Sequence, residues 1–195
     1  VRDRRWPRRF LHWERSGGST GTPLRIPIDP VTYARRQFRF LGALIECGYR
    51  PGDRFLMLTT RPTGRHPMLP NCFCADIRAA PEVLLRVYRQ FRPRLVYGPL
   101  NSLLLLGEAM DACPQRLERP DVLVATAEEL TDSHRRRLRT AFAVDPADFY
   151  GLSEAGLVAW RPPSARSYRT ADRDLYLEFL PVPGDSALER LVVTD

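Results

Sequence analysis

The stretch Ser16-Gly17-Gly18-Ser19-Thr20-Gly21-Thr22-Pro23 is the most informative part of the chain. Its glycines permit a backbone with positive φ that turns several N–H groups toward one point. A concave row of N–H groups binds an anion, and the hydroxyls of Ser16, Ser19 and Thr20 add further donors. The stretch therefore favours a loop that holds a polyphosphate, and its composition would also suit a plain flexible turn.

The stretch and the residues around it do not match two well-known kinds of phosphate-binding loop. A Walker loop has a lysine directly after its last glycine, whereas Thr22 follows Gly21 here. The dinucleotide-binding pattern G-x-G-x-x-G is absent, and so is its strand-to-helix context. We predict that residues 10–13 and residues 23–28 are extended, because the second segment alternates and contains two prolines. The loop would then join two strands as a glycine-rich hairpin.

A second motif, Phe149-Tyr150-Gly151-Leu152-Ser153-Glu154, lies far downstream. Taken alone, Glu154 would be an exposed carboxylate at the end of a strand, which is the common fate of a single Glu. Together with the first loop, however, the motif resembles the adenylate-forming enzyme superfamily. That superfamily contains acyl-CoA synthetases, luciferases and the adenylation domains of peptide synthetases. Its two motifs have the same order along the chain as the two found here.

Three weaker segments make the chain most similar to the phenylacetate-CoA ligase group and its capsule-biosynthesis relatives. They are Tyr97-Gly98-Pro99-Leu100-Asn101-Ser102, Ala125-Thr126-Ala127-Glu128-Glu129-Leu130-Thr131 and Glu189-Arg190-Leu191-Val192-Val193-Thr194-Asp195. The resemblance extends over almost the whole chain from about residue 10. It implies an ATP-dependent enzyme that joins a small-molecule carboxylic acid to AMP and then, usually, to CoA.

The resemblance also implies which residues form the site. The backbone of Gly17, Gly18 and Gly21, with the hydroxyls of the first loop, would grip the β- and γ-phosphates of ATP. Glu154 would hold Mg²⁺, a hard cation that prefers carboxylate and phosphate oxygens, and Ser153 would hydrogen-bond the α-phosphate. The residues implied at the adenine are Ala127, Glu128 and the backbone of Phe149 and Tyr150. Tyr97 and Gly151 would lie near the acyl group.

Alternating strands and helices in the middle of the chain predict an α/β fold. We expect a largely parallel sheet with covering helices and a few antiparallel strands, as part of the large domain of an adenylate-forming enzyme. The expected helices cover residues 30–47, 81–91 and 99–112 and a segment from Thr131 or Asp132 to 142. The expected strands and extended runs cover residues 53–60, 94–97, 121–125, 148–150, 175–180 and 190–194. Ligands gather at the carboxyl ends of such parallel strands, where the Tyr97, Ala127 and Tyr150 motifs would lie.

The first expected helix has clear signals at both ends. Asp29-Pro30 is a typical N-cap followed by a first-turn proline, and Gly48 is a typical stop. Along the helix, apolar Phe38, Leu41, Leu44 and Ile45 are expected to form one buried face.

The chain departs from the superfamily in one respect of composition: it contains no lysine, and all 30 basic residues are arginine. Adenylate-forming enzymes usually supply a catalytic lysine from a small C-terminal lid domain. We therefore expect residues 1–195 to be a single, partial AMP-binding domain without its lid, with little turnover of its own. The alternative is a non-catalytic nucleotide-binding or interaction module that retains the sheet.

Charge and cysteine content limit other functions. The net charge is +7, and arginines cluster in residues 2–9 and 135–139. Aromatic residues are not interleaved with these clusters as in a base-stacking surface, so we expect no nucleic-acid partner. Cys47, Cys72, Cys74 and Cys113 have no zinc-binding spacing and are expected to be reduced thiols, two of them in the core.

No apolar run approaches the ~20 residues of a membrane helix. A signal peptide is also not visible in the sequence. We therefore expect a cytoplasmic protein without a membrane partner, and the sequence predicts no particular oligomeric state.

Overall fold

A computed structural model of the chain describes residues 6–15, 24–66, 69, 71–113, 115, 117–182 and 184–194. Its residues divide into two units. The larger unit comprises Ala43–Tyr150 and Trp160–Tyr168. The smaller unit comprises Val1–Gly42, Gly151–Ala159 and Arg169–Asp195.

The larger unit is built on the predicted parallel sheet. Its strands are β3 (Phe55–Thr59), β4 (Gly64–Arg65), β5 (Cys72–Asp76), β6 (Leu95–Pro99), β7 (Val122–Thr126) and β8 (Ala147–Leu152). They follow the order β8-β7-β6-β3-β5-β4. Every pair is parallel except β4 with β5, which is antiparallel. The α/β fold class expected from the sequence is confirmed.

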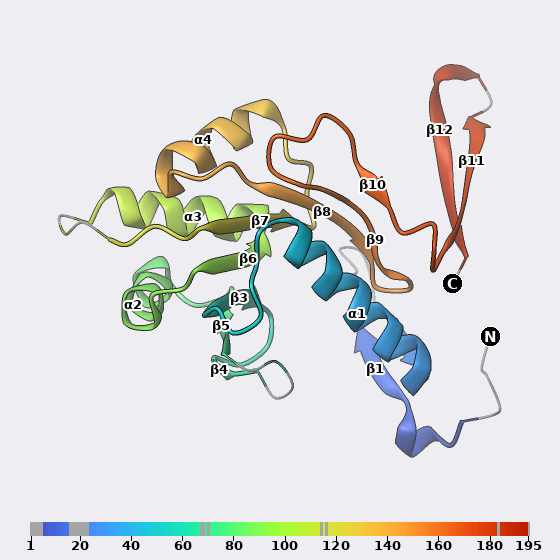
Figure 1. Cartoon of the computed structure of the whole chain (residues 1–195), viewed down its shortest axis with the longest axis horizontal. Coiled ribbons are helices and arrows are strands. Elements are labelled where there is room, and N and C mark those ends of the chain that lie inside the picture. The colour runs from blue at the N-terminus through green and yellow to red at the C-terminus, as the bar shows by residue number, and fades with distance from the viewer. Residues whose placement is uncertain are drawn as a thin grey trace. The chain divides into compact units, whose positions relative to one another are not determined.

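Three helices cover one face of this sheet: α2 (Pro81–Phe91), α3 (Leu100–Asp111) and α4 (Asp132–Phe142). Figure 1 shows α3 between α2 and α4, and α3 contacts both neighbours. A hydrophobic core fills the space between the helices and the sheet. Its fully buried members include Leu56, Val96 and Leu123 from the strands and Leu84, Leu103 and Phe142 from the helices. Burial of this surface is the main source of stability, at roughly 25 cal/mol per Å² of apolar area.

The other face of the sheet carries a row of aromatic rings. Successive ring centroids lie 6.0 Å apart from Tyr49 to Phe55, 6.4 Å from Phe55 to Tyr97 and 6.3 Å from Tyr97 to Phe149. Side chains alternate between the faces of a strand, so these rings lie opposite the core that includes Leu56 and Val96. The row ends at the second sequence motif.

The helix ends follow the local sequence signals. Asp29 Oδ1 accepts hydrogen bonds from Val31 N at 2.9 Å and Thr32 N at 3.1 Å, so Asp29 caps α1 (Pro30–Glu46) as predicted. Gly48, with φ of 103°, follows the end of α1. Thr131 Oγ1 accepts from His134 N at 3.3 Å and caps α4.

The smaller unit contains antiparallel pairs. Strands β1 (His12–Arg15) and β2 (Arg25–Ile28) pair with His12 opposite Ile28, which confirms the two strands predicted to flank the glycine-rich loop. Phe10 differs from the prediction, because it ends a 3₁₀ turn over Arg8–Phe10. Strands β11 (Tyr176–Val182) and β12 (Asp185–Thr194) form a second antiparallel pair. Strand β9 (Gly156–Arg161) is hydrogen-bonded to β10 (Arg169–Thr170). The short strands β4, β5, β9 and β10 were not predicted.

The prediction for the buried face of α1 is largely wrong. Phe38 is 74% exposed and Ile45 is 47% exposed, although Leu44 is buried as expected. The buried positions include Arg36 and Arg39, each 8% exposed. Hydrogen bonding to main-chain oxygens, described below, is what allows charged side chains to take these positions.

Among the described residues, no helix combines the length and the apolar character needed to cross a membrane. The four cysteines are free thiols, and three of them, Cys47, Cys72 and Cys74, are buried rather than two. Burial raises the pKa of the Cys72 thiol to about 12 and also raises that of Cys74.

We predict that Ellman's reagent at pH 8 labels Cys113 well before the other three thiols of the folded chain. Cys113 is partly exposed, whereas the buried thiols are inaccessible and Cys72 stays protonated at this pH. Stopped-flow absorbance would show one rapid equivalent, and denaturant would release the rest. The Cys113→Ser variant should lose the rapid phase; retention of that phase would contradict the burial of the other three thiols.

We also predict that Gly98→Ala destabilises the chain by about 1–3 kcal/mol. A Cβ on Gly98 would lie 2.6 Å from Leu58 Cβ on the neighbouring strand, so the core would have to shift. The matched control is Gly42→Ala in α1, where a Cβ would have no atom within 4 Å and alanine favours the helix by ~1 kcal/mol. Urea titration followed by circular dichroism compares the two variants, and equal stabilities would contradict the prediction.

Candidate nucleotide site

The parallel register brings the predicted site segments of the larger unit to one edge of the sheet. Pro99 of β6 lies opposite Thr126 of β7, and Thr126 lies opposite Phe149 of β8. These three residues lie toward the carboxyl ends of parallel strands, which is where α/β sheets bind ligands. The segments that contain Tyr97, Ala127 and Tyr150 are therefore neighbours in space, as the sequence predicted.

Thr126 links β7 to β8 through its side chain. Its Oγ1 donates a hydrogen bond to the carbonyl oxygen of Phe149 at 2.9 Å. The ring of Tyr97 meets that of Phe149 edge to face, with an interplanar angle of 70°. Burial raises the pKa of the Tyr97 phenol, and a hydrogen bond with the Thr126 side chain opposes that rise. Tyr97 therefore stays neutral near pH 7 and can act as a polar contact without carrying charge.

The two residues after β7, Ala127 and Glu128, were predicted to border the adenine. They differ in backbone conformation and in contacts. Ala127 has φ of 71°, in the left-handed region that is uncommon for alanine. Glu128 Oε1 accepts a hydrogen bond from Asn101 N at 3.3 Å, in the first turn of α3. A carboxylate is favoured there by the free N–H groups and the dipole of the helix. The Glu128 side chain thus has a structural partner in the first turn of α3.

Phe149 and Tyr150 differ in exposure. The Phe149 side chain is 2% exposed and belongs to the aromatic row, so only its main chain can contribute to a ligand contact. Tyr150 is 44% exposed and presents its ring to solvent. This difference follows from the alternation of side chains along β8.

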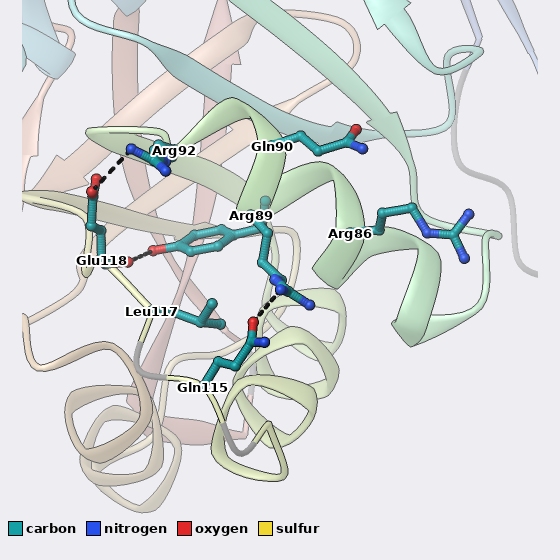
Figure 2. A pocket seen from close by; sticks show the side chains of 8 residues that line it. Arg86, Arg89, Gln90, Arg92, Gln115, Leu117 and Glu118 are labelled. Atoms are coloured by element: carbon teal, nitrogen blue, oxygen red, sulfur yellow. Dashed lines mark hydrogen bonds and ion pairs between the residues drawn. The ribbon is translucent and has the colours of Figure 1, made fainter.

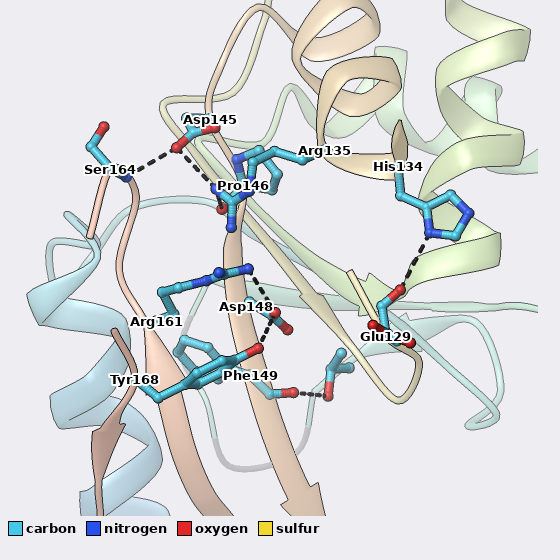
Figure 3. Close-up of polar contacts among 11 residues, drawn as sticks. Glu129, His134, Arg135, Asp145, Pro146, Asp148, Phe149, Arg161, Ser164 and Tyr168 are labelled. Atoms are coloured by element: carbon cyan, nitrogen blue, oxygen red, sulfur yellow. Dashed lines mark hydrogen bonds and ion pairs between the residues drawn. The ribbon is translucent and has the colours of Figure 1, made fainter. Parts of the chain in front are cut away.

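A polar network on the helix side of β8 was missed by the sequence analysis (Figure 3). Asp148, 5% exposed, accepts a hydrogen bond from Arg161 Nη2 at 3.3 Å and one from the Tyr168 hydroxyl. Burial, together with the contact to Asp148, raises the pKa of Tyr168 to about 12. A buried carboxylate without such partners would be costly, so the network fixes β8 against the segment Trp160–Tyr168.

A second carboxylate, just before β8, has a separate set of polar contacts. Asp145 Oδ2 accepts from Arg135 Nη1 and from Ser164 N, both at 3.0 Å. Arg135 also donates to the carbonyl oxygen of Pro146 at 3.0 Å. The only signal for this network in the sequence was the presence of acidic residues beside an otherwise apolar strand.

The motif continues into the smaller unit as a tight turn. Ala155 N donates to Leu152 O at 3.3 Å, and Gly151 lies so close to Gly156 that a Cβ on Gly151 would lie 2.8 Å from Gly156 O. Any other residue at Gly151 would therefore displace the main chain. Ser153 is partly exposed and Glu154 is exposed. The predicted metal ligand and the predicted α-phosphate contact are both accessible to a ligand.

Two arginines of α1, also missed by the sequence analysis, donate to the main chain of this turn. Arg36 donates to the carbonyl oxygens of Ser153 and Glu154, and Arg39 donates to that of Ala155. Helical spacing places both arginines on one face of α1.

The predicted phosphate loop lies outside the described residues. This applies to all of its predicted ligand contacts, namely Ser16, Gly17, Gly18, Ser19, Thr20 and Gly21. The described strands on either side pair up to Arg15 opposite Arg25.

The motif offers one side chain that suits a magnesium ion, the Glu154 carboxylate. Among the described residues, no group of three or more His, Cys, Asp or Glu side chains could hold a metal ion. A single exposed carboxylate such as Glu154 suits a cation that takes most of its ligands from phosphates and water, as Mg²⁺ does with nucleotides.

A separate polar hollow of about 490 Å³ lies beside α2 and contains none of the predicted site residues (Figure 2). Two of its three lining arginines have partners: Arg92 lies 3.6 Å from Glu118, and Arg89 donates to Gln115. The Tyr88 hydroxyl donates to the carbonyl oxygen of Glu118 at 2.7 Å. The hollow therefore has the contacts of an ordinary polar surface.

Comparison with known proteins finds similar structures but no matching sequence family. No protein-family model and no curated protein sequence matches the chain. An open form of 2-hydroxyisobutyryl-CoA ligase in complex with 2-HIB-AMP and CoA matches with a TM-score of 0.71 at 14% identity, over 90% of this chain and 42% of that one. An anthranilate CoA ligase in complex with anthranoyl-AMP matches with a TM-score of 0.71 at 17% identity, over 95% of this chain and 39% of that one.

A long-chain-fatty-acid-CoA ligase from Archaeoglobus fulgidus also matches, with a TM-score of 0.63 at 13% identity, over 93% of this chain and 41% of that one. The chain thus spans about two fifths of the length of the solved structures that it matches. At these identities the likeness concerns the fold. The chain has the mixed α/β fold of the matched part of these CoA ligases.

Proposed function

We propose that the chain is a partial AMP-binding domain of an ATP-dependent carboxylate-activating ligase of the phenylacetate-CoA ligase type. The observation that carries the proposal is the turn after β8, which presents an exposed carboxylate, Glu154, directly after a strand of a parallel sheet. The shared fold supports it, because two of the matching ligases hold an acyl-AMP.

In the proposed reaction, a carboxylate oxygen of the acid attacks the α-phosphorus of ATP. The bond from the α-phosphorus to the oxygen that bridges to the β-phosphate breaks, and pyrophosphate leaves. The CoA thiol then attacks the acyl carbonyl, loses its proton, and AMP leaves. The first step builds negative charge on phosphate oxygens, so a protein accelerates it mainly by positioning and by fixed hydrogen-bond donors.

Each predicted residue has a place in this scheme. Backbone N–H groups of Gly17 to Gly21 and the hydroxyls of the first loop hold the β- and γ-phosphates. The Ser153 hydroxyl donates to the α-phosphate. Ala127, Glu128 and the backbone of Phe149 and Tyr150 border the adenine. Tyr97 and Gly151 lie on the acyl side.

Glu154 would hold Mg²⁺ together with the phosphates, and the cation would neutralise charge on the departing pyrophosphate. The exposure of Glu154 and the lack of a metal-binding cluster among the described residues suit a cation that arrives with the nucleotide.

A second candidate function is nucleotide binding without turnover. The composition favours it, since none of the 30 basic residues is a lysine that could bridge the carboxylate and the α-phosphate. Both candidates require ATP binding, and only the first allows acid-dependent pyrophosphate release.

We predict that the chain binds ATP·Mg²⁺ and that Glu154→Gln raises the dissociation constant by about tenfold, or ~1.4 kcal/mol. The loss should vanish in EDTA, because the carboxylate acts through the cation. Calorimetry measures both conditions.

Asp172→Asn, another exposed acid of the smaller unit, is the control and should bind as the wild type. Gly18→Val should weaken binding with and without Mg²⁺. Absence of binding at millimolar ATP would contradict the proposal.

We further predict that the chain alone releases pyrophosphate from ATP no faster than its Glu154→Gln variant, whichever carboxylic acid is added. Without a lysine, the developing charge on the α-phosphate and the attacking carboxylate lacks its usual bridging cation. A coupled pyrophosphate assay over aryl, acyl and amino acids measures this. Acid-dependent release above the variant's rate would exclude the binding-only candidate and identify the substrate.

A further inference from the structure

Two buried arginines of α1 hold the main chain of the turn that carries Glu154. We propose that Arg36 and Arg39 are positioning residues that fix the direction of the Glu154 carboxylate and thereby determine the Mg²⁺-dependent part of nucleotide binding. This inference rests on the proposed function and extends it to residues outside both sequence motifs.

The contacts reach three consecutive carbonyl oxygens. Arg36 Nη1 donates to Ser153 O at 3.4 Å, and Arg36 Nη2 donates to Glu154 O. Arg39 Nη2 donates to Ala155 O at 2.6 Å. Consecutive carbonyls point to opposite sides in a strand, so their convergence on one helix face is particular to this turn.

The position of Arg36 has a direct consequence for Glu154. The carbonyls of Ser153 and Glu154 belong to the two peptide groups on either side of the Glu154 Cα atom. Because one guanidinium group binds both, it restricts the φ and ψ angles of Glu154 and so the direction of its Cα–Cβ bond. The carbonyls face the buried Arg36, while the Glu154 side chain is exposed.

Arginine is suited to this task in a way that lysine is not. Its planar guanidinium has donors in a fixed fork that can reach two acceptors at once, whereas a lysine ammonium is a point charge on a flexible stem. Both arginines are only 8% exposed, and burial of a charge is costly unless its donors are used. Arg39 Nη1 also lies 3.7 Å from Asp174 Oδ2, which holds the second arginine in place.

The glycine at the end of the turn makes room for this arrangement. Gly156 has φ of 72°, and a Cβ there would lie 3.2 Å from Arg36 Cδ and 3.3 Å from Arg36 Cγ. The aliphatic stem of Arg36 therefore packs directly on the Gly156 backbone. The turn and the arginine are complementary in shape as well as in hydrogen bonding.

The test compares Arg36→Lys, Arg36→Gln and Arg39→Gln with the control Arg35→Gln, an exposed arginine on the same helix. We expect each Arg36 variant to raise the dissociation constant of ATP·Mg²⁺ by about tenfold. Binding of ATP in EDTA should stay within about twofold of the wild type, since only the carboxylate–cation contact is affected. Arg35→Gln should change neither value. The lysine variant keeps the charge and the stem, so it remains informative if the glutamine variant folds poorly.

A double-mutant cycle separates positioning from general destabilisation. If Arg36 acts through Glu154, the Arg36→Gln change should cause no further loss of ATP·Mg²⁺ binding in a Glu154→Gln background. Additive losses, an equal loss in EDTA, or unchanged binding in the Arg36 variants would overturn the inference. A wild type that binds no ATP·Mg²⁺, or binds it independently of Glu154, would instead show that the proposed function is wrong.

Discussion

The parallel pairing of β6, β7 and β8 is the constraint on which the candidate site depends. It places Pro99, Thr126 and Phe149 opposite one another at the edge where the strands end. Because side chains alternate along a strand, a slip of one residue in β8 would turn Phe149 toward the helices and Asp148 into the aromatic row. The two faces of β8 therefore require different side chains: Phe149 packs in the aromatic row, and Asp148 binds the polar network on the other face. This difference opposes a change of register.

Buried charge performs similar work just before the motif and at its end. Asp148 precedes the motif and is held by Arg161 and Tyr168, while Arg36 binds the main chain of the last two residues of the motif. In each case a costly buried charge is compensated by several hydrogen bonds, and losing one partner would leave the other uncompensated. Such contacts add less to net stability than apolar packing does, but they permit only one arrangement of the backbone.

The sequence predicted those elements whose signals are local. Asp29-Pro30 and Thr131 fix helix starts through contacts within three residues, and the helix over Pro81–Phe91 was predicted with its observed bounds. Strand β5 was missed because Cys72, Phe73 and Cys74 lie in a proline-rich context, and their strand character comes from pairing with β3. The face of α1 was mispredicted because apolar periodicity places Phe38 inside, whereas long-range hydrogen bonds bury Arg36 instead.

The roles of Arg36 and Arg39 explain why the site could be predicted only in part from its motifs. Their acceptors are carbonyl oxygens of residues more than a hundred positions away, and a carbonyl group leaves no signature in the sequence. A turn held through its main chain keeps the side chains of Ser153 and Glu154 free to meet a ligand. A turn held through those side chains would be equally rigid, but it would have used the hydroxyl and the carboxylate for structure. Anchoring by carbonyls is therefore the arrangement that makes the motif both rigid and accessible.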